Sequence, residues 1–296
     1  MSTARVLFDE PGPRGRRRIR IVTVITSVVI VAIAAVAVLR FSQAGQLAGA
    51  KWSPFTEPGI PKFLLDGLLN TLKVTGVAAL VAFPLGALFA LIRLARNRIA
   101  RWLATVYIEV FRSTPLLLLI YMFVGALPAL GLNLSLFWKL TIPIVLVNVA
   151  LLAEVFRAGV RALPRGQGEA AAAIGLTYWQ SMRLVILPQA IRIIVPALVT
   201  QLVSLLKDST LGYAASYAEL LNTAKNLTSF YSNFIQSYLV VAVIFVLINL
   251  GLSYLARQLD RRLGRGRGAM RGRVPAGEQQ REEEILESTT MRTGMR

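Results

Sequence analysis

Long stretches of apolar residues dominate the sequence and limit the folds that the chain can adopt. A helix rises about 1.5 Å per residue, so roughly 20 apolar residues cross the ~30 Å hydrocarbon core of a bilayer. Hydrophobic residues make up 55% of the 296-residue chain, which argues against a water-soluble fold. We predict an all-α integral membrane protein with six transmembrane helices, at residues 21–39, 63–92, 103–127, 136–153, 191–206 and 234–255.

The first apolar stretch follows a strongly basic N-terminus. It is longer than the ~7–15-residue core of a secretory signal peptide. The nearby A-x-A cleavage pattern, Ala48-Gly49-Ala50, lies well beyond its end. We therefore expect a retained N-terminal transmembrane helix at 21–39, between a cytoplasmic basic tail at 1–20 and an extracytoplasmic loop at 40–62.

Basic residues are distributed unevenly between the loops. Arginines cluster before the first predicted helix, after the second, around the connection that follows the fourth, and after the last. Because loops rich in Lys and Arg stay in the cytoplasm, we predict a multi-pass membrane protein with both termini cytoplasmic. Topology thus explains the formal net charge of +18, and we expect membrane lipid, and no nucleic acid, as a partner.

The C-terminal residues 259–296 differ in composition from the rest of the chain. They are rich in Gly, Arg and Glu and contain almost no apolar residues to bury. Because such segments cannot offset the entropy that folding removes, we predict a disordered cytoplasmic tail.

Two residue types are absent from the sequence, and this restricts its chemistry. The chain has no cysteine and no histidine, which excludes disulfides, thiolate metal sites and Ser-His or Cys-His catalysis. No G-x-x-x-x-G-K-[ST] loop occurs, so we expect no ATP binding by that route. We predict that the chain is not an enzyme and has no catalytic residue, bound cofactor or metal.

Residues 161–190 form the longest predicted cytoplasmic loop, and their local chemistry predicts two short helices. Pro164 and Gly168 mark the start of the first helix. Glu169 suits a helix N-terminus, where a carboxylate meets the positive end of the helix dipole. Gly175 can adopt a positive φ and end this helix.

A second short helix is predicted to follow in the same loop. Thr177 and Gln180 have the spacing of a capping box, and Pro188 bends the chain back toward the membrane. We expect Trp179 to pack against these short helices. The alanine-rich first helix suits docking on a cytoplasmic partner, whereas an ordinary folded loop explains the same pattern.

A group of six residues in this loop has a characteristic spacing. It comprises Glu169, Ala170, Ala171, Gly175, Leu187 and Pro188. The spacing resembles the EAA loop of ATP-binding-cassette importer permeases, although Val185 stands where that family usually has isoleucine. The resemblance implies that these six residues couple the permease to a separate ATPase subunit.

Further segments resemble the polar amino acid permeases, which transport histidine, glutamine, glutamate and related substrates. The resemblance covers residues 65–255. It implies the type I (MetI-like) permease fold at 63–258, with the helix at 21–39 as an addition. The similar segments are 67–72, 109–116, 154–159 and 207–211, the last with Ser209 and Thr210 in the reverse of the usual order.

The resemblance also implies a function and a set of partners. The chain would be the permease subunit of an ATP-driven importer in the bacterial cell membrane for a polar amino acid, with glutamate or glutamine favoured. An ATP-binding-cassette ATPase, which uses ATP and Mg, would drive alternating access through the EAA loop. A second, paralogous permease would complete a heterodimer, and an extracytoplasmic amino-acid-binding protein would deliver the substrate.

The alternative function is an ATP-independent secondary transporter or channel for small polar solutes. Such transporters are often built from inverted repeats with broken helices at matching positions, and none is visible in the sequence. This alternative also leaves the EAA loop without a purpose.

Charged residues inside predicted membrane helices are costly in lipid and mark candidates for the translocation path or its gate. The candidates are Glu109, Arg112, Thr114, Lys207 and Asp208. Glu109 and Arg112 are three residues apart and therefore share a helix face, so a structural ion pair near the inner surface is the alternative. For Lys207 the alternative is a side chain that extends to the membrane interface.

Overall fold

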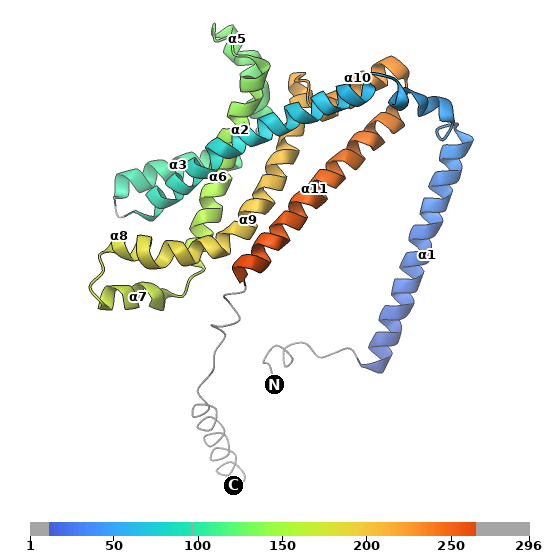
Figure 1. Ribbon diagram of the computed structural model, residues 1–296. Coiled ribbons are helices and arrows are strands. Elements are labelled where there is room, and N and C mark those ends of the chain that lie inside the picture. Colours follow the sequence, from blue (N-terminus) through green and yellow to red (C-terminus); the bar gives the residue numbers. More distant parts are fainter. Residues whose placement is uncertain (1–11, 96, 265–296) are drawn as a thin grey trace. The chain divides into compact units, whose positions relative to one another are not determined.

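Helices are the only regular elements in the part of the chain that the structure describes (Figure 1). This computed structural model describes residues 12–95 and 97–264. The long helices are α1 (Pro13–Gln43), α2 (Ile60–Leu94), α3 (Arg98–Ser113), α6 (Leu136–Arg161), α9 (Leu187–Asp208), α10 (Leu220–Tyr231) and α11 (Phe234–Gly264). The short ones are η2 (Gly49–Lys51), η3 (Ser53–Thr56), α4 (Leu116–Tyr121), the π-helix η4 (Met122–Ala126), α5 (Leu127–Ala129), α7 (Arg165–Ala173), α8 (Tyr178–Ser181), the π-helix η5 (Met182–Ile186) and η6 (Ser209–Ala215).

Five helical segments of the described chain are long and apolar enough to cross a membrane, or six if one bent pair counts as a span. The prediction of a single helix at 103–127 is wrong, because the chain turns by 93° between Arg98–Ser113 and Leu116–Ala129. Pro115 causes the break. Its ring disfavours a helical ψ in the preceding residue, and Thr114 has φ −87° and ψ 126°.

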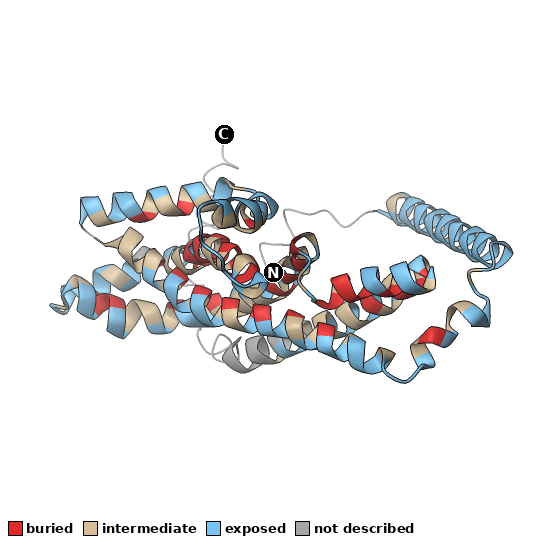
Figure 2. Ribbon diagram, turned by 90° about the horizontal axis from the view of Figure 1, so that it is seen from above, coloured by how far each residue is buried: buried red, intermediate tan, exposed pale blue. Residues whose placement is uncertain are grey.

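The chain divides into two units, and the first contains residues 12–64 and 224–240. Its helix α1 is longer than the predicted span, so it includes parts of the predicted tail and of the predicted loop on either side. None of its most apolar window is buried, and Figure 2 shows it exposed along its length. A helix with an apolar window that is exposed on all sides is suited to contact with lipid.

Polar contacts within the first unit hold the segment that follows α1. The side-chain amide of Gln236 donates to the backbone carbonyl of Gln46 over 2.6 Å. The Tyr231 hydroxyl donates to the Glu57 carboxylate, also over 2.6 Å. This segment is therefore attached to the turn between α10 and α11.

The second unit contains residues 65–223 and the remainder of α11, and its core forms around α6. Small residues let the helices approach closely. A Cβ atom at Gly86 on α2 would lie 2.6 Å from Cβ of Leu152 on α6. One at Gly159 on α6 would lie 2.1 Å from a side-chain carbon of Ile194 on α9. Glycine is therefore required where α2 and α9 pack on α6.

The last helix, α11, continues to Gly264. The sequence predicted that the disordered tail begins at residue 259. Residues 259–264 are instead helical, so this boundary was wrong. The rest of the predicted tail, residues 265–296, lies outside the described residues.

A buried carboxyl group fixes the start of α10. Glu219 is fully buried, and its two oxygens accept the N–H groups of Leu221 (2.7 Å) and Asn222 (2.6 Å). The Thr71 hydroxyl on α2 accepts the N–H of Leu220 over 3.0 Å. Burial raises the pKa of Glu219 from 4.5 to about 7, although the two backbone hydrogen bonds lower it.

Stability is therefore expected to fall as the pH rises from about 4.5 through about 7. A carboxyl group with a higher pKa in the folded than in the unfolded protein binds its proton more tightly when folded. Its contribution, up to about 3 kcal/mol, is present below the unfolded pKa of 4.5 and lost as the pH passes the folded value. Glu219→Gln cannot ionise and should remove this slope in thermal unfolding measured in detergent. The same slope in the variant would contradict the assignment.

Candidate functional site

The predicted loop between α6 and α9 contains two short helices, α7 and α8. The first begins at Arg165 after Pro164 as its N-cap, so Glu169 lies in the second turn and not at the N-terminus. Gly175 ends α7 with a φ of +83°. Its N–H donates to the Ala172 carbonyl over 2.9 Å, and the N–H of the next residue donates to the Ala171 carbonyl over 3.1 Å. This pair of bonds is a Schellman motif, which satisfies the last carbonyls of the helix.

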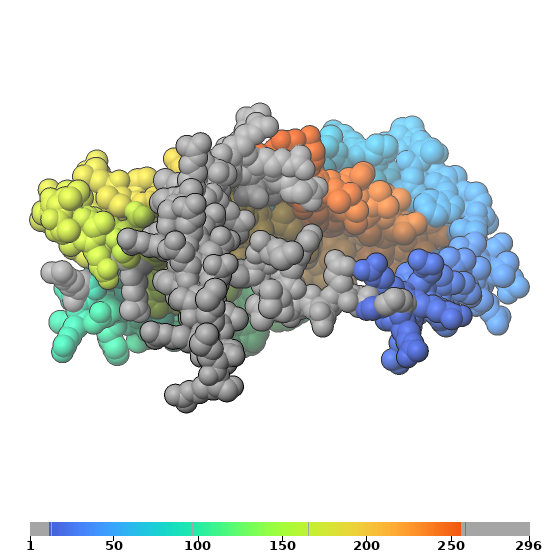
Figure 3. All heavy atoms as spheres, turned by 90° about the horizontal axis from the view of Figure 1, so that it is seen from below, coloured from blue at the N-terminus to red at the C-terminus, as the bar shows by residue number. Residues whose placement is uncertain are grey.

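The second helix begins with the predicted capping box. The Thr177 N–H donates to the Gln180 side chain over 2.9 Å, and the Gln180 N–H donates to the Thr177 hydroxyl over 3.4 Å. The Tyr178 hydroxyl donates to the backbone carbonyl of Leu94 over 2.9 Å, so α8 is braced against the end of α2. Figure 3 accordingly shows α7 and α8 at the surface beside the start of α3.

The six residues of the EAA-like group lie in this loop and at the beginning of α9. Ala171 is buried, whereas Glu169, Ala170 and Gly175 are exposed. Leu187 and Pro188 are the first residues of α9, directly after η5. The prediction for Trp179 is wrong: its side chain is 57% exposed and contacts the ring of Tyr178 edge-on at 5.3 Å. The loop therefore presents a surface of small, acidic and aromatic residues.

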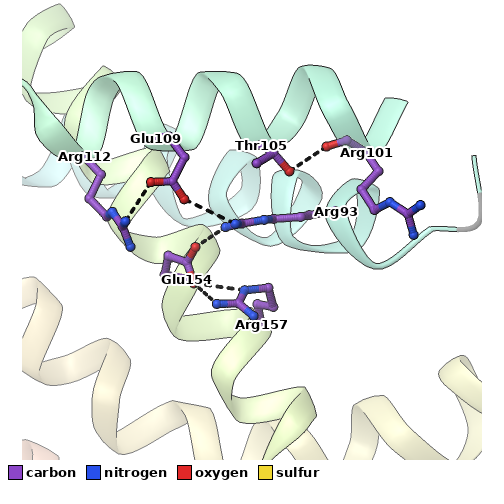
Figure 4. A network of polar contacts seen from close by, with 7 residues as sticks. All are labelled: Arg93, Arg101, Thr105, Glu109, Arg112, Glu154 and Arg157. Carbon is purple, nitrogen blue, oxygen red and sulfur yellow. Dashed lines mark hydrogen bonds and ion pairs between the residues drawn. The ribbon is translucent and has the colours of Figure 1, made fainter. Parts of the chain in front are cut away.

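An ion-pair network connects α2, α3 and α6 (Figure 4). Arg93 of α2 pairs with Glu109 of α3 at 3.4 Å and with Glu154 of α6. Arg112 lies 2.7 Å from Glu109, and Arg157 donates through Nε to Glu154 over 2.9 Å. The network thus contains three arginines and two glutamates, and Arg93 joins its two halves.

The sequence predicted only one ion pair of this network, the one between Glu109 and Arg112. The Glu109–Arg112 pair is present, but both side chains are 45% exposed, whereas Arg93 and Glu154 are 18% and 19% exposed. Arg93 and Glu154 were missed because they come from different helices. The one available signal was Glu154 with Arg157 in the segment 154–159, since residues three apart on a helix face the same side.

A second polar group lies between α6 and α9. Asn148 is fully buried, and its amide nitrogen donates to the Asp208 carboxylate over 3.0 Å. Its amide oxygen accepts from the Gln201 amide over 2.9 Å. Asp208 is therefore hydrogen-bonded to Asn148, and the described residues include no ion pair between Asp208 and the exposed Lys207. Sequence reasoning missed both amides, although each is the only Asn or Gln in its predicted span.

Replacing Asn148 with leucine is expected to cost about 1–3 kcal/mol of stability, because the Asp208 carboxylate and the Gln201 amide each lose a buried partner. The measurement is thermal unfolding of the purified variant in detergent. Thr200→Val is the matched control, since Thr200 is exposed and, among the described residues, its hydroxyl bonds only to the Pro196 carbonyl of its own helix, over 3.3 Å. Equal losses in the two variants would contradict a role of Asn148 between the helices.

The remaining candidate, Thr114, lies at the break after α3. Its hydroxyl donates to the Val110 carbonyl over 2.8 Å. The five candidates for the translocation path thus fall into two places: Glu109, Arg112 and Thr114 at the end of α3, and Lys207 and Asp208 at the end of α9.

Sequence comparisons identify the relatives of this chain. Residues 82–265 match the family model of binding-protein-dependent transport system inner membrane components. The chain is 34% identical to the glutamate transport system permease protein GluD of Corynebacterium glutamicum, over 78% of this chain and 87% of that protein. It is 36% identical to the glutamate/aspartate import permease protein GltK of Escherichia coli O157:H7, over 71% of this chain and 97% of that protein.

Solved structures show the same fold. A chain of the crystal structure of an amino acid ABC transporter with histidines superposes with a TM-score of 0.66 and 32% identity, over 68% of this chain and 94% of that chain. A chain of the inward-facing MetNI methionine ABC transporter gives a TM-score of 0.59 at 22% identity, over 70% and 99% of the two chains. The chain therefore belongs to the polar amino acid permeases of ATP-binding-cassette importers, a family of multi-pass membrane proteins whose ATPase is a separate subunit.

Proposed function

We propose that this chain is the permease subunit of a glutamate or glutamine importer and that a separate ATPase moves its α7–α8 loop. The glutamate in the names of GluD and GltK supports this substrate class. The observation that carries the coupling role is the position of the loop. It is exposed, it is braced on the end of α2 through Tyr178, and it continues through η5 into α9. A displacement of α7 and α8 is therefore transmitted to two spanning helices.

The proposed orientation places both termini and the α7–α8 loop in the cytoplasm. The arginine-rich connections after α2 and after α6 support it. The proposed partners are an ATPase that uses ATP and Mg, a paralogous second permease in a heterodimer, and an extracytoplasmic amino-acid-binding protein. ATP would bias the permease between inward-facing and outward-facing states.

The proposed translocation path includes the polar groups at the end of α9. Asp208 is half-buried and hydrogen-bonded to Asn148, and the exposed ammonium of Lys207 is adjacent in sequence. A free amino acid carries one ammonium and one carboxylate group. The Asp208 carboxylate is complementary in charge to the ammonium, and the Lys207 ammonium is complementary to the carboxylate. The network around Arg93 would act as a gate, since it joins three helices.

Uptake by the reconstituted complex tests the proposed function. Proteoliposomes that contain this chain, its ATPase and its second permease would be supplied with the binding protein and labelled glutamate or glutamine. We expect uptake of at least one of the two substrates that requires both ATP and Mg. Uptake that persists without ATP and follows an ion gradient would instead establish the secondary-transporter alternative.

A further inference from the structure

A groove separates the α7–α8 loop from the end of α6. It has a volume of about 820 Å³. Its apolar wall comprises Val160, Leu163, Leu176, Met182 and Ile186, and Arg161 also lines it. We call it the loop groove. Because α7 forms one side of it, an occupant of the groove would contact the same helix that the proposed function assigns to ATPase coupling.

Two exposed arginines lie at or next to the lining of the loop groove. Arg161 lines it, and Arg183 directly follows the lining residue Met182 in sequence, whereas α7 contributes the exposed acid Glu169. Neither arginine forms an ion pair with any residue in the described part of the chain. A complementary occupant would therefore be apolar in the middle and acidic at its edges.

The chain itself contains such a segment beyond the end of α11. Residues 282–287 read Glu-Glu-Glu-Ile-Leu-Glu, which places two large apolar residues among four of the 15 acidic residues of the whole chain. We call it the acidic segment. The other acidic residues are spread along the chain, so no second segment of this composition exists.

The acidic segment is close enough in sequence to the end of α11 to reach the groove. Glu282 comes 18 residues after Gly264. A random-coil chain of that length has an end-to-end distance of roughly 25 Å on average and of about 60 Å when extended. Figure 1 shows the end of α11 at the same end of the second unit as α7 and α8.

We propose that the acidic segment docks in the loop groove of its own chain. Ile285 and Leu286 pack on the apolar wall, and the neighbouring glutamates pair with Arg161 and Arg183. Because the segment is tethered to α11, its effective concentration at the groove is high. Weak contacts are therefore enough for docking, and weak contacts make docking reversible. The docked segment restrains α7. This consequence rests on the proposed function, whereas the docking itself does not.

Disulfide cross-linking tests the docking directly, because the natural chain has no cysteine. The test pair is Leu176→Cys with Leu286→Cys. The control pair is Ile99→Cys with Leu286→Cys, because Ile99 is 73% exposed at the start of α3, outside the groove. Both pairs are made in the full chain, co-expressed with its transporter partners and oxidised mildly in native membranes. We expect the test pair to close within one chain at least ~10-fold faster than the control pair.

Charge variants show whether the contact has the proposed chemistry. Arg161→Glu with Arg183→Glu should slow the test pair several-fold, and replacing Glu282, Glu283 and Glu284 with lysine in that background should restore it. If Leu176→Cys disturbs the loop, Leu163→Cys provides a second position in the same groove. Equal rates in the test and control pairs would overturn the proposal. So would a product in which the cysteine introduced in the groove is joined to a second copy or to the ATPase subunit.

Uptake of glutamate and glutamine is measured separately, on unoxidised membranes that contain the natural, cysteine-free chain with the same partners. Normal uptake by the natural chain without a test cross-link in the double-cysteine chain rejects only the docking. A fast test cross-link, with no uptake of either substrate by the natural chain, leaves the docking established and rejects the proposed substrate class.

Discussion

Replacing Glu154 with glutamine is expected to cost about 2–4 kcal/mol of stability. Glu154 pairs with Arg93 and Arg157, and its side chain is only 19% exposed. Removing one partner from a fully buried pair typically costs about 3–5 kcal/mol because a charge remains uncompensated, and the partial exposure reduces this figure. The network would keep three arginines with one glutamate. Thermal unfolding in detergent should show a midpoint lower by roughly 5–15 °C.

Three further variants separate the network from a general effect of charge. Arg112→Gln removes an arginine that is 45% exposed and should cost less than about 1 kcal/mol. Arg157→Gln in the Glu154→Gln background removes one uncompensated arginine and should recover part of the loss. The third variant is Arg157→Gln alone. If the loss of stability in the double variant equals the sum of the losses in Glu154→Gln and Arg157→Gln, the contact between Glu154 and Arg157 carries no coupling energy.

The spanning helices were predictable because their signal is local. Twenty apolar residues in a row have few alternatives to a membrane helix, and five of the six predicted spans lie inside observed helices. The sixth failed at Pro115. The effect of a proline on the residue before it is also local, so the break at Thr114 was within reach of the sequence, but the hydropathy of 103–127 concealed it.

The α7–α8 loop was also predictable, for the same reason. A glycine at a helix end and a Thr-x-x-Gln capping box depend on neighbouring residues alone, and both are present in the structure. The sequence predicted Glu169 in the first turn of α7, whereas it lies in the second turn. Proline is favoured at the start of a helix, and α7 begins directly after Pro164. Local rules thus predicted which elements form, with an error of a few residues at the boundary.

The polar contacts between helices were not predictable. Arg93 and Glu154 are 61 residues apart, and Asn148 and Asp208 are 60 apart. Their pairing depends on which faces of α2, α6 and α9 meet, and apolar periodicity cannot decide this in spans that are hydrophobic all round. A single amide in a long apolar span, such as Asn148 or Gln201, signals only that some partner must exist.

Replacing Gly175 with valine is expected to reduce ATP-driven uptake roughly five- to a hundred-fold. Gly175 has a φ of +83°, where a β-branched residue costs about 1–3 kcal/mol of strain, and the Schellman motif at the end of α7 should open to relieve it. Apart from Gly175 and its two neighbours in the chain, no described residue has an atom within 4 Å of the position that a Cβ would occupy, so the effect comes from the backbone and not from a clash. Uptake and ATP hydrolysis are measured together in proteoliposomes.

The comparison with Gly175→Asn decides whether the shape of the loop or the glycine itself matters. Asparagine tolerates a positive φ far better than valine, so this variant should retain most of the uptake. Because position 175 lies between α7 and α8 and outside the spanning helices α2, α6 and α9, both variants should unfold in detergent at about the same temperature. Valine should therefore separate hydrolysis from uptake: ATP is still consumed while transport falls. If valine and asparagine support equal uptake, the conformation at the end of α7 does not transmit the motion of the ATPase, and the coupling role proposed for this loop is wrong.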